Sequence, residues 1–257
     1  ENHRISERLA GSAQTMVMEK RSSVSVCYGI FEVICLKLKD YFQEDEEREQ
    51  SLHMGMLLSF AIGILNACTY VTRGHVFASS QSGNLLYMGL DFAAGDFSKF
   101  PKYIFCILMF GLGVFLAEHF HSKYRHLGWR KISTLVEITL ISLATFMPDS
   151  WNMIANPIFG LVCGLQSITF RIFNSVSLPT ININANIQNA IQNISRYAHT
   201  EDDESLQKFT LYTTIVATYL AGIILGAVLA NSMGHYVSFV SVACLMIALI
   251  MMIPKKK

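Results

Sequence analysis

The segment SSQSGNLLYMGL, Ser79–Leu90, opens with small polar residues and continues in a helical pattern of apolar ones. It belongs to a stretch from Gly74 to Leu90 that contains no charged side chain, and strongly apolar segments lie on both sides of it. Polar backbone is tolerated at membrane depth only where protein or a water-filled cavity surrounds it. Whether this segment spans, enters or avoids a membrane therefore decides the topology of the chain.

The composition is typical of an integral membrane protein. Of the 257 residues, 52% are hydrophobic and 15% are charged, and a spanning helix needs roughly 20 mostly apolar residues. We predict six spanning helices, at Leu52–Thr72, Tyr103–Phe120, Ile132–Met147, Met153–Ile172, Phe209–Ala230 and Tyr236–Ile253. The prediction is therefore an all-α integral membrane protein in contact with the lipid bilayer.

The N-terminal residues 1–50 differ from the rest, since they hold seven Lys/Arg and ten Asp/Glu. Six residues fall on one helical face: Cys27, Ile30, Phe31, Ile34, Leu38 and Tyr41. This pattern predicts an amphipathic helix that lies on the membrane surface. We interpret residues 1–50 as a cytoplasmic extension and as a candidate docking site for a cytoplasmic partner.

The remaining chain contains an internal repeat of two halves, 51–150 and 151–257. The sequence GILNACTYVTR from Gly63 aligns with CGLQSITFRIF from Cys163 at an offset of one hundred residues. Further along, SGNLLYMGL from Ser82 matches NANIQNAIQ from Asn184. The segments GVFLA and GIILG then share the small-x-x-x-small spacing that lets helices approach closely. Each half reads as helix, polar segment, helix, helix.

The distribution of basic residues favours six spans over eight. With six spans and both termini in the cytoplasm, 17 Lys/Arg lie inside and 3 outside, whereas eight spans give 14 and 6. Three spans per half make the two repeats inverted. The polar segments Ser79–Leu90 and Thr180–Ile194 are then half-helices or re-entrant segments from opposite faces of a bacterial plasma membrane. For the second segment, an asparagine-rich helix on the cytoplasmic surface is the alternative.

The sequence LLSFAIGILNACTYVTRGHVFASSQSGNLLYMGL, together with GLQSITFR in the second half, resembles the YoaK family of uncharacterised multi-pass bacterial membrane proteins. The resemblance covers roughly residues 57–253. It implies a six-helix membrane protein of the kind often described as a transporter without a known substrate. This chain has Asn66 where the family often places Asp, and Asn184-Ala185 where it usually carries Thr-Gly. An amide at position 66 cannot titrate, which argues against proton coupling there.

The candidate solute contacts are uncharged polar residues at equivalent places in the two halves. They are Asn66, Thr69, Ser82, Gly83 and Asn84 in the first half and Gln166, Thr169, Asn184 and Asn186 in the second. Buried amides in membrane helices also bond neighbouring helices, so helix packing is the alternative for each of them. For Gly83 the alternatives are close approach of a ligand and close approach of a helix.

Charged residues inside the spans are the other candidates. Glu137 lies in the short third span, where a carboxylate is costly, and it is a candidate proton-coupling group. A position at the membrane interface beside Arg130 and Lys131 accounts for it equally well. We interpret Arg73 and Arg171, which close the first and fourth helices, as side chains that extend to the membrane interface, with anion contact as the alternative.

Other function classes find little support in the sequence. The six cysteines show no Cys-x-x-Cys spacing, and no fixed set of metal ligands is evident. The net charge of +1 argues against nucleic acid, and no catalytic constellation indicates an enzyme or a cofactor.

We therefore expect a secondary transporter or permeation protein for a small polar solute, with its site between the two repeats, and we consider a homo-oligomer. The alternative is a non-transporting membrane scaffold.

Overall fold

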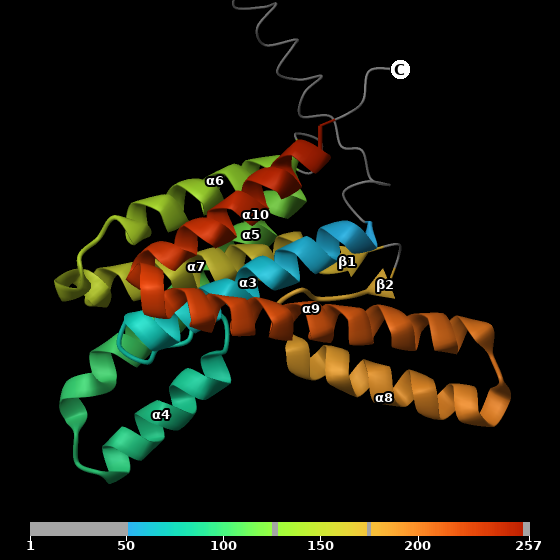
Figure 1. Ribbon diagram of the computed structural model, residues 1–257, viewed down its shortest axis with the longest axis horizontal. Helices are drawn as coiled ribbons and strands as arrows, with labels where there is room; N and C mark the ends of the chain where they lie inside the picture. Colours follow the sequence, from blue (N-terminus) through green and yellow to red (C-terminus); the bar gives the residue numbers. More distant parts are fainter. Residues whose placement is uncertain (1–50, 125–127, 174–175, 254–257) are drawn as a thin grey trace, which may run out of the picture. The chain divides into compact units, whose positions relative to one another are not determined.

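The computed structural model describes residues 51–124, 128–173 and 176–253, which are mostly helical (Figure 1). The helices are α3 (Leu52–Thr72), α4 (Gln81–Ala93), α5 (Phe100–Tyr124), α6 (Trp129–Thr145), α7 (Asn152–Thr169), α8 (Ile183–Thr200), α9 (Asp203–Met233) and α10 (Ser238–Met251). Short 3₁₀ turns, η1 (Phe97–Lys99), η3 (Asp149–Trp151) and η4 (Gly234–Val237), precede α5, α7 and α10. The predicted N-terminal amphipathic helix lies outside the described residues.

Each predicted span corresponds to a helix: α3, α5, α6, α7, α9 and α10, in chain order. The largest difference is at the start of α9, which begins at Asp203 rather than at Phe209. Asp202 caps this helix, because its side chain accepts a hydrogen bond from the N–H of Glu204. A polar first turn thus extends the helix ahead of its apolar part.

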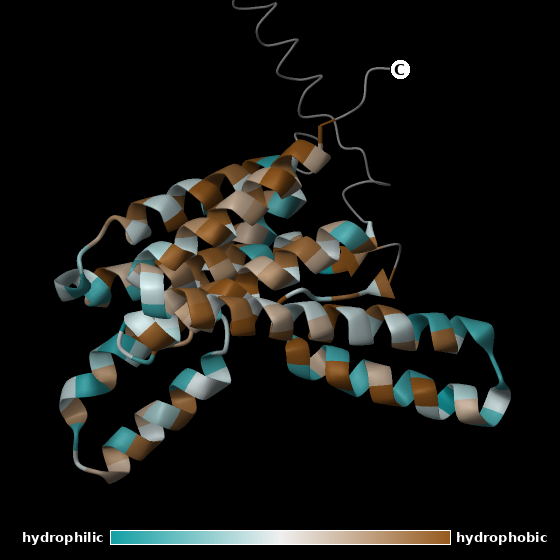
Figure 2. Cartoon of the chain, in the orientation of Figure 1, coloured by the Kyte–Doolittle hydropathy of each residue, from teal (hydrophilic) through white to brown (hydrophobic). Residues whose placement is uncertain are grey.

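Three helical stretches are long and apolar enough to cross a membrane, Leu52–Thr72, Phe97–Lys123 and Asp203–Met251. The last of these contains both α9 and α10, which are joined by η4. Figure 2 shows hydrophobic residues along these helices and a hydrophilic turn between α8 and α9. The described chain thus has the helices of a membrane protein.

Two close helix pairs form the centre of the described chain: α3 packs along α9, and α5 packs along α7. Glycines allow both approaches. A Cβ atom added at Gly63 would overlap the backbone of Tyr219 in α9, and one added at Gly164 would overlap the backbone of Phe110 in α5. Gly113 and Gly222, in the two segments with small-x-x-x-small spacing, meet the backbones of Leu161 and Phe60 in the same way, as that spacing predicts.

The outer contacts follow the same pattern in both halves. Helix α10 packs on α3, α6 packs on α7, and α6 and α10 pack on each other. Helix α4 contacts α5, and α8 contacts α9. Each of these helix contacts made by one half therefore has a counterpart made by the other half.

A short antiparallel hairpin joins α7 to the second polar segment. Its strands are β1 (Ile172–Phe173) and β2 (Val176–Ser177), with Ile172 opposite Ser177. We did not predict it, because two-residue strands are too short to show an alternating pattern.

Candidate functional site

The starts of α4 and α8 are each fixed by a buried asparagine. Asn84 accepts a hydrogen bond from the N–H of Phe77 at 2.9 Å and donates to the carbonyl of the same residue at 2.9 Å. Asn186 donates to the carbonyl of Pro179 at 2.7 Å, also seven residues earlier. Its Oδ1 has no partner among the described residues, because proline has no N–H to donate. Both side chains thus clamp the preceding loop onto the first turn of a helix.

Asn66 attaches the first polar segment to two helices. Its Nδ2 donates to Ser79 Oγ at 2.5 Å and to the hydroxyl of Tyr219 in α9 at 2.8 Å. Its Oδ1 accepts from the N–H of Ser79 at 3.0 Å. Thr69 donates to the carbonyl of Asn66 at 3.2 Å. Every hydrogen-bonding atom of the Asn66 amide group therefore serves the packing of α3, α9 and the segment before α4.

The second half lacks this network. Gln166 is fully buried, and neither atom of its amide group has a hydrogen-bond partner among the described residues. The repeat alignment places Phe110 opposite Tyr219, so the phenol hydroxyl is missing here. The hydroxyl of Thr180 is likewise buried without a partner among the described residues. The two halves thus differ in their polar contacts.

A cavity of about 490 Å³ lies between the starts of the two polar segments. Its lining comprises Ser79, Ser80, Gln81 and Ser82 from the first segment, Ser177, Pro179, Ile181, Asn182, Ile183 and Asn184 from the second, and Phe110, Ser167, Arg171 and Tyr219 from the helices behind them. Nine of these fourteen residues carry a hydroxyl or an amide group, and Arg171 is the one charged residue of this lining. Figure 1 shows α4 and α8 on the same side of α9.

The predicted site residues are thus divided. Ser82 and Asn184 line the cavity, whereas Asn84 and Asn186 are buried behind it as clamps. Gly83 serves packing, because a Cβ atom there would lie 2.7 Å from the ring of Phe77. Asn66, Thr69 and Gln166 do not line the cavity, although Ser167 and Tyr219, which do, are their neighbours in sequence or by hydrogen bond.

Thr169 belongs to a different cluster, at the contact of α6 and α7. Its hydroxyl accepts from Trp129 Nε1 at 3.2 Å and lies 3.1 Å from Ser133 Oγ. Ser133 donates to Glu137 Oε1 at 3.0 Å. Glu137 is fully buried, and its Oε2 has no partner among the described residues. Glu137 is therefore a buried carboxylate within α6, and its proton-coupling role and the alternative position at the membrane interface both stay predictions.

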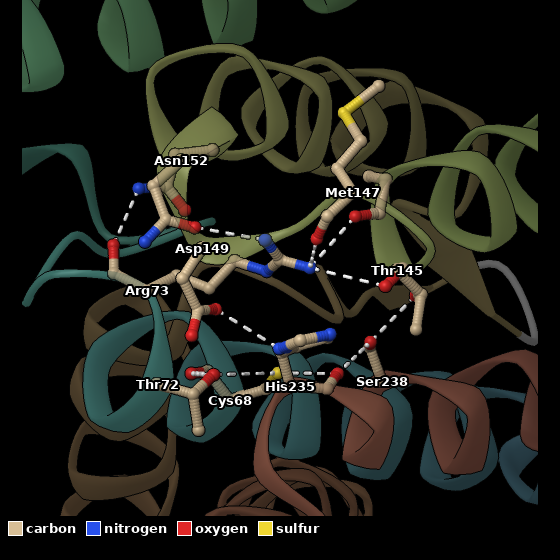
Figure 3. Close-up of polar contacts among 11 residues, drawn as sticks. Cys68, Thr72, Arg73, Thr145, Met147, Asp149, Asn152, His235 and Ser238 are labelled. Carbon is tan, nitrogen blue, oxygen red and sulfur yellow. Dashed lines mark hydrogen bonds and ion pairs between the residues drawn. The ribbon is translucent and has the colours of Figure 1, made fainter.

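The prediction that the Arg73 side chain extends outward is wrong, because this side chain is fully buried and bonds the end of α6 and the start of α7 (Figure 3). The guanidinium donates to Asn152 Oδ1 at 2.9 Å and to the carbonyls of Ala144 at 2.9 Å and Met147 at 3.1 Å. The last carbonyls of α6 have no partner within their own helix. Arg73 supplies donors for them and joins the ends of α3 and α6 to the start of α7.

Arg171 behaves differently from Arg73. Its side chain is half-exposed and lies 3.7 Å from the carboxylate of Glu118. An exposed pair at this distance contributes little to stability. The charge of Arg171 thus lies at the edge of the cavity that this residue lines.

Sequence reasoning missed Phe110, Tyr219 and the role of Arg73. The signal for the first two was present in the repeat, because each lies three residues before a glycine of the matched segments GVFLA and GIILG. An arginine at the end of an apolar helix gives no comparable signal, since exposed and buried forms look alike in sequence.

The described residues define an all-α protein of the membrane type, with a polar cavity between two helix starts. The chain belongs to the family described as "Protein of unknown function (DUF1275)", which matches residues 54–252. The predicted membership of an uncharacterised family is confirmed. No curated protein and no solved structure matches the chain.

Proposed function

We propose that the protein is a secondary transporter or permeation protein for a small polar solute, with its binding site in the cavity between α4 and α8. The observation that carries the proposal is the composition of that cavity, which hydroxyl and amide groups from both polar segments line. Ligand sites in transporters lie at the interface of repeats, next to interrupted helices. A scaffold would need no such space.

The proposed architecture is six spans in two inverted repeats. The support for this architecture is the reciprocal packing of the two halves. Helix α3 of the first half packs on α9 of the second, and α7 of the second half packs on α5 of the first. The glycine crossings at Gly63 and Gly164 are equivalent in the same way.

The contacts of Arg73 support six spans rather than eight. They bring the end of α3 to the end of α6 and the start of α7, and these three points share one membrane face only if α4 does not span. Helix α4 has 13 residues, about 20 Å at 1.5 Å per residue, which is shorter than a bilayer core of about 30 Å.

The proposed location is a bacterial plasma membrane with both termini in the cytoplasm. The basic residues support this orientation, since it places 17 of the 20 Lys/Arg inside. In this orientation α4 re-enters from outside and α8 from inside.

Cysteine accessibility tests the proposal. Single cysteines at Ser82 and Asn184, on a background without native cysteines, are exposed in membranes to a charged methanethiosulfonate reagent. We expect both to react, because a thiol in water ionises, and Ile247→Cys, an exposed position inside the apolar helix α10, to stay unreactive in lipid. If Ser82→Cys and Asn184→Cys react no faster than Ile247→Cys, the cavity is dry and the proposal is wrong.

The second candidate function is a non-transporting membrane scaffold. The observation in its favour is that Asn66, Asn84 and Asn186 use their amide groups to bind other parts of the chain. The accessibility experiment separates the two candidates, because a scaffold does not require water beside Ser82 and Asn184.

A further inference from the structure

The cavity is open on one side within the described part of the chain. Helices α5, α7 and α9 contribute Phe110, Ser167 and Tyr219 behind it. Figure 1 shows no described segment beyond α4 and α8 on the other side. Ser82 and Asn184, which line the cavity, are accordingly exposed.

The same side of α8 carries amide side chains. Asn184, Gln188 and Gln192 are exposed at helical spacing, with Ile187 and Ile191 beside them. Figure 2 shows hydrophilic and hydrophobic residues alternating along this helix. Lipid tails cannot accept or donate hydrogen bonds, so amide groups at membrane depth require a protein or water neighbour.

Helix α4 carries exposed apolar residues. Leu85, Leu86 and Leu90 are exposed, and the helix packs chiefly on α5 and η1. We call these leucines and the exposed residues of α8 together the α4–α8 face (Leu85, Leu86, Leu90, Asn184, Ile187, Gln188, Ile191 and Gln192). This face has an apolar part and an amide part, and the polar cavity lies between them.

We propose that a second copy of this chain covers the α4–α8 face and closes the cavity. Two copies in one membrane are related by an axis along the membrane normal, so each residue meets the partner at its own depth. Apolar α4 then meets apolar α4, and the amides of α8 meet the same amides. An amide group both donates and accepts hydrogen bonds, so it can pair with its own copy, which a carboxylate or an ammonium group cannot do.

The charges near the face agree with this partner. On α4 the one charged residue is Asp91, and it is paired within the chain to Lys99 at 3.1 Å. On α8 the one Lys or Arg is Arg196, near the end of the helix that lies away from the cavity. Like charges therefore do not oppose each other across the middle of the face. The inference rests on the proposed membrane topology, and it makes the solute site complete only in the dimer.

Disulfide cross-linking of the full-length chain in membranes tests the dimer. Leu86→Cys on α4 (62% exposed) and Ile191→Cys on α8 (61%) are each introduced on a background without native cysteines and oxidised with copper phenanthroline. Ile250→Cys (64%) on α10 is the matched control. We expect a species of twice 28.8 kDa from the first two variants and the monomer from the control.

A second variant removes an amide without adding charge. Gln188→Leu suits a lipid environment at least as well as the native residue, so folding should persist. We expect at least a threefold lower dimer fraction on dilution in detergent, measured by native mass spectrometry, while Gln188→Asn retains most of it. An unchanged dimer fraction in Gln188→Leu would show that the Gln188 amide makes no contact between the two copies.

Two outcomes overturn the inference. One is a monomer in every cross-linking variant and in native mass spectra. The other is a cross-link from Leu86→Cys or Ile191→Cys to a different protein. If the cavity cysteines do not react but cross-linking is efficient, the transporter proposal is wrong and the dimer is supported. If the cavity cysteines react but the chain is a monomer, only the dimer proposal is wrong.

Discussion

The amide of Asn66 donates to Ser79 Oγ at 2.5 Å, while Gln166, which the sequence repeat aligns with Asn66, makes no such bond among the described residues. Tyr219 completes the first network, and the second half has Phe110 in its place. The first polar segment is therefore bonded to the helices behind it through the side chain of Ser79. The second is bonded to them through its backbone, because Ser59 Oγ in α3 donates to the carbonyl of Thr180 at 3.0 Å.

We predict opposite effects for the two amides. Asn66→Ala should lower the free energy of unfolding by about 1–3 kcal/mol, because Ser79 and Tyr219 lose buried partners. Gln166→Leu should be neutral or stabilising, because it removes a buried amide group that has no partner among the described residues. Thermal unfolding in detergent measures both. Equal losses in the two variants would contradict the asymmetry.

Tyr219→Phe isolates the hydroxyl of the first network. The variant removes one hydrogen bond to Asn66 and reproduces the residue found at position 110. We expect a loss of about 1 kcal/mol and faster reaction of a cysteine at Ser80 with a charged thiol reagent. Tyr236→Phe, an exposed tyrosine, is the control and should change neither quantity.

The close helix crossings give a third prediction. Gly164→Ala should destabilise the protein by about 1–3 kcal/mol or prevent folding, because the new Cβ would overlap the backbone of Phe110. Gly89→Ala is the control, since nothing lies within 4 Å of its Cβ position, and alanine there should be neutral or stabilising. Yield of folded protein and thermal unfolding report the result, and a Gly164→Ala variant as stable as the native chain would show that the crossing can widen.

The helices were predictable because apolar runs of sufficient length have no other common explanation. The clamps were only half predictable. The repeat alignment marked Asn84 and Asn186 as a pair. An asparagine, however, can line a cavity or bind a loop equally well. The hydrogen bonds to the backbone of Phe77 and Pro179 show that these two bind a loop.

Arg73 shows where sequence reasoning fails for a physical reason. The same long side chain can extend to the membrane surface or turn inward, and the choice depends on whether unpaired carbonyls are within reach. These carbonyls belong to the end of α6, more than seventy residues later in the chain. The residues next to Arg73 in the sequence therefore do not indicate whether its side chain is buried.

Arg73→Lys should cost about 1.5–3 kcal/mol, because an ammonium group cannot reach Asn152 and the carbonyls of α6 together. Arg171→Lys, at a half-exposed position, is the matched control and should stay within about 0.5 kcal/mol. Thermal unfolding of the two variants side by side measures the difference. Equal small effects would mean that the bonds of Arg73 contribute no net stability.

The cap of α9 gives a pH prediction. The hydroxyl of Ser205 donates to Asp202 at 2.8 Å, and this bond holds the pKa of the Asp202 carboxyl below its ordinary value. A carboxyl whose pKa is lower in the folded state stabilises the fold above its unfolded pKa of about 3.9, and this contribution is lost as the pH falls through the folded value. Asp202→Asn keeps the cap but cannot titrate. We therefore expect the difference in Tm between the native chain and Asp202→Asn to shrink as the pH is lowered from 6 to 3, and a constant difference would show that the carboxylate has no stabilising role.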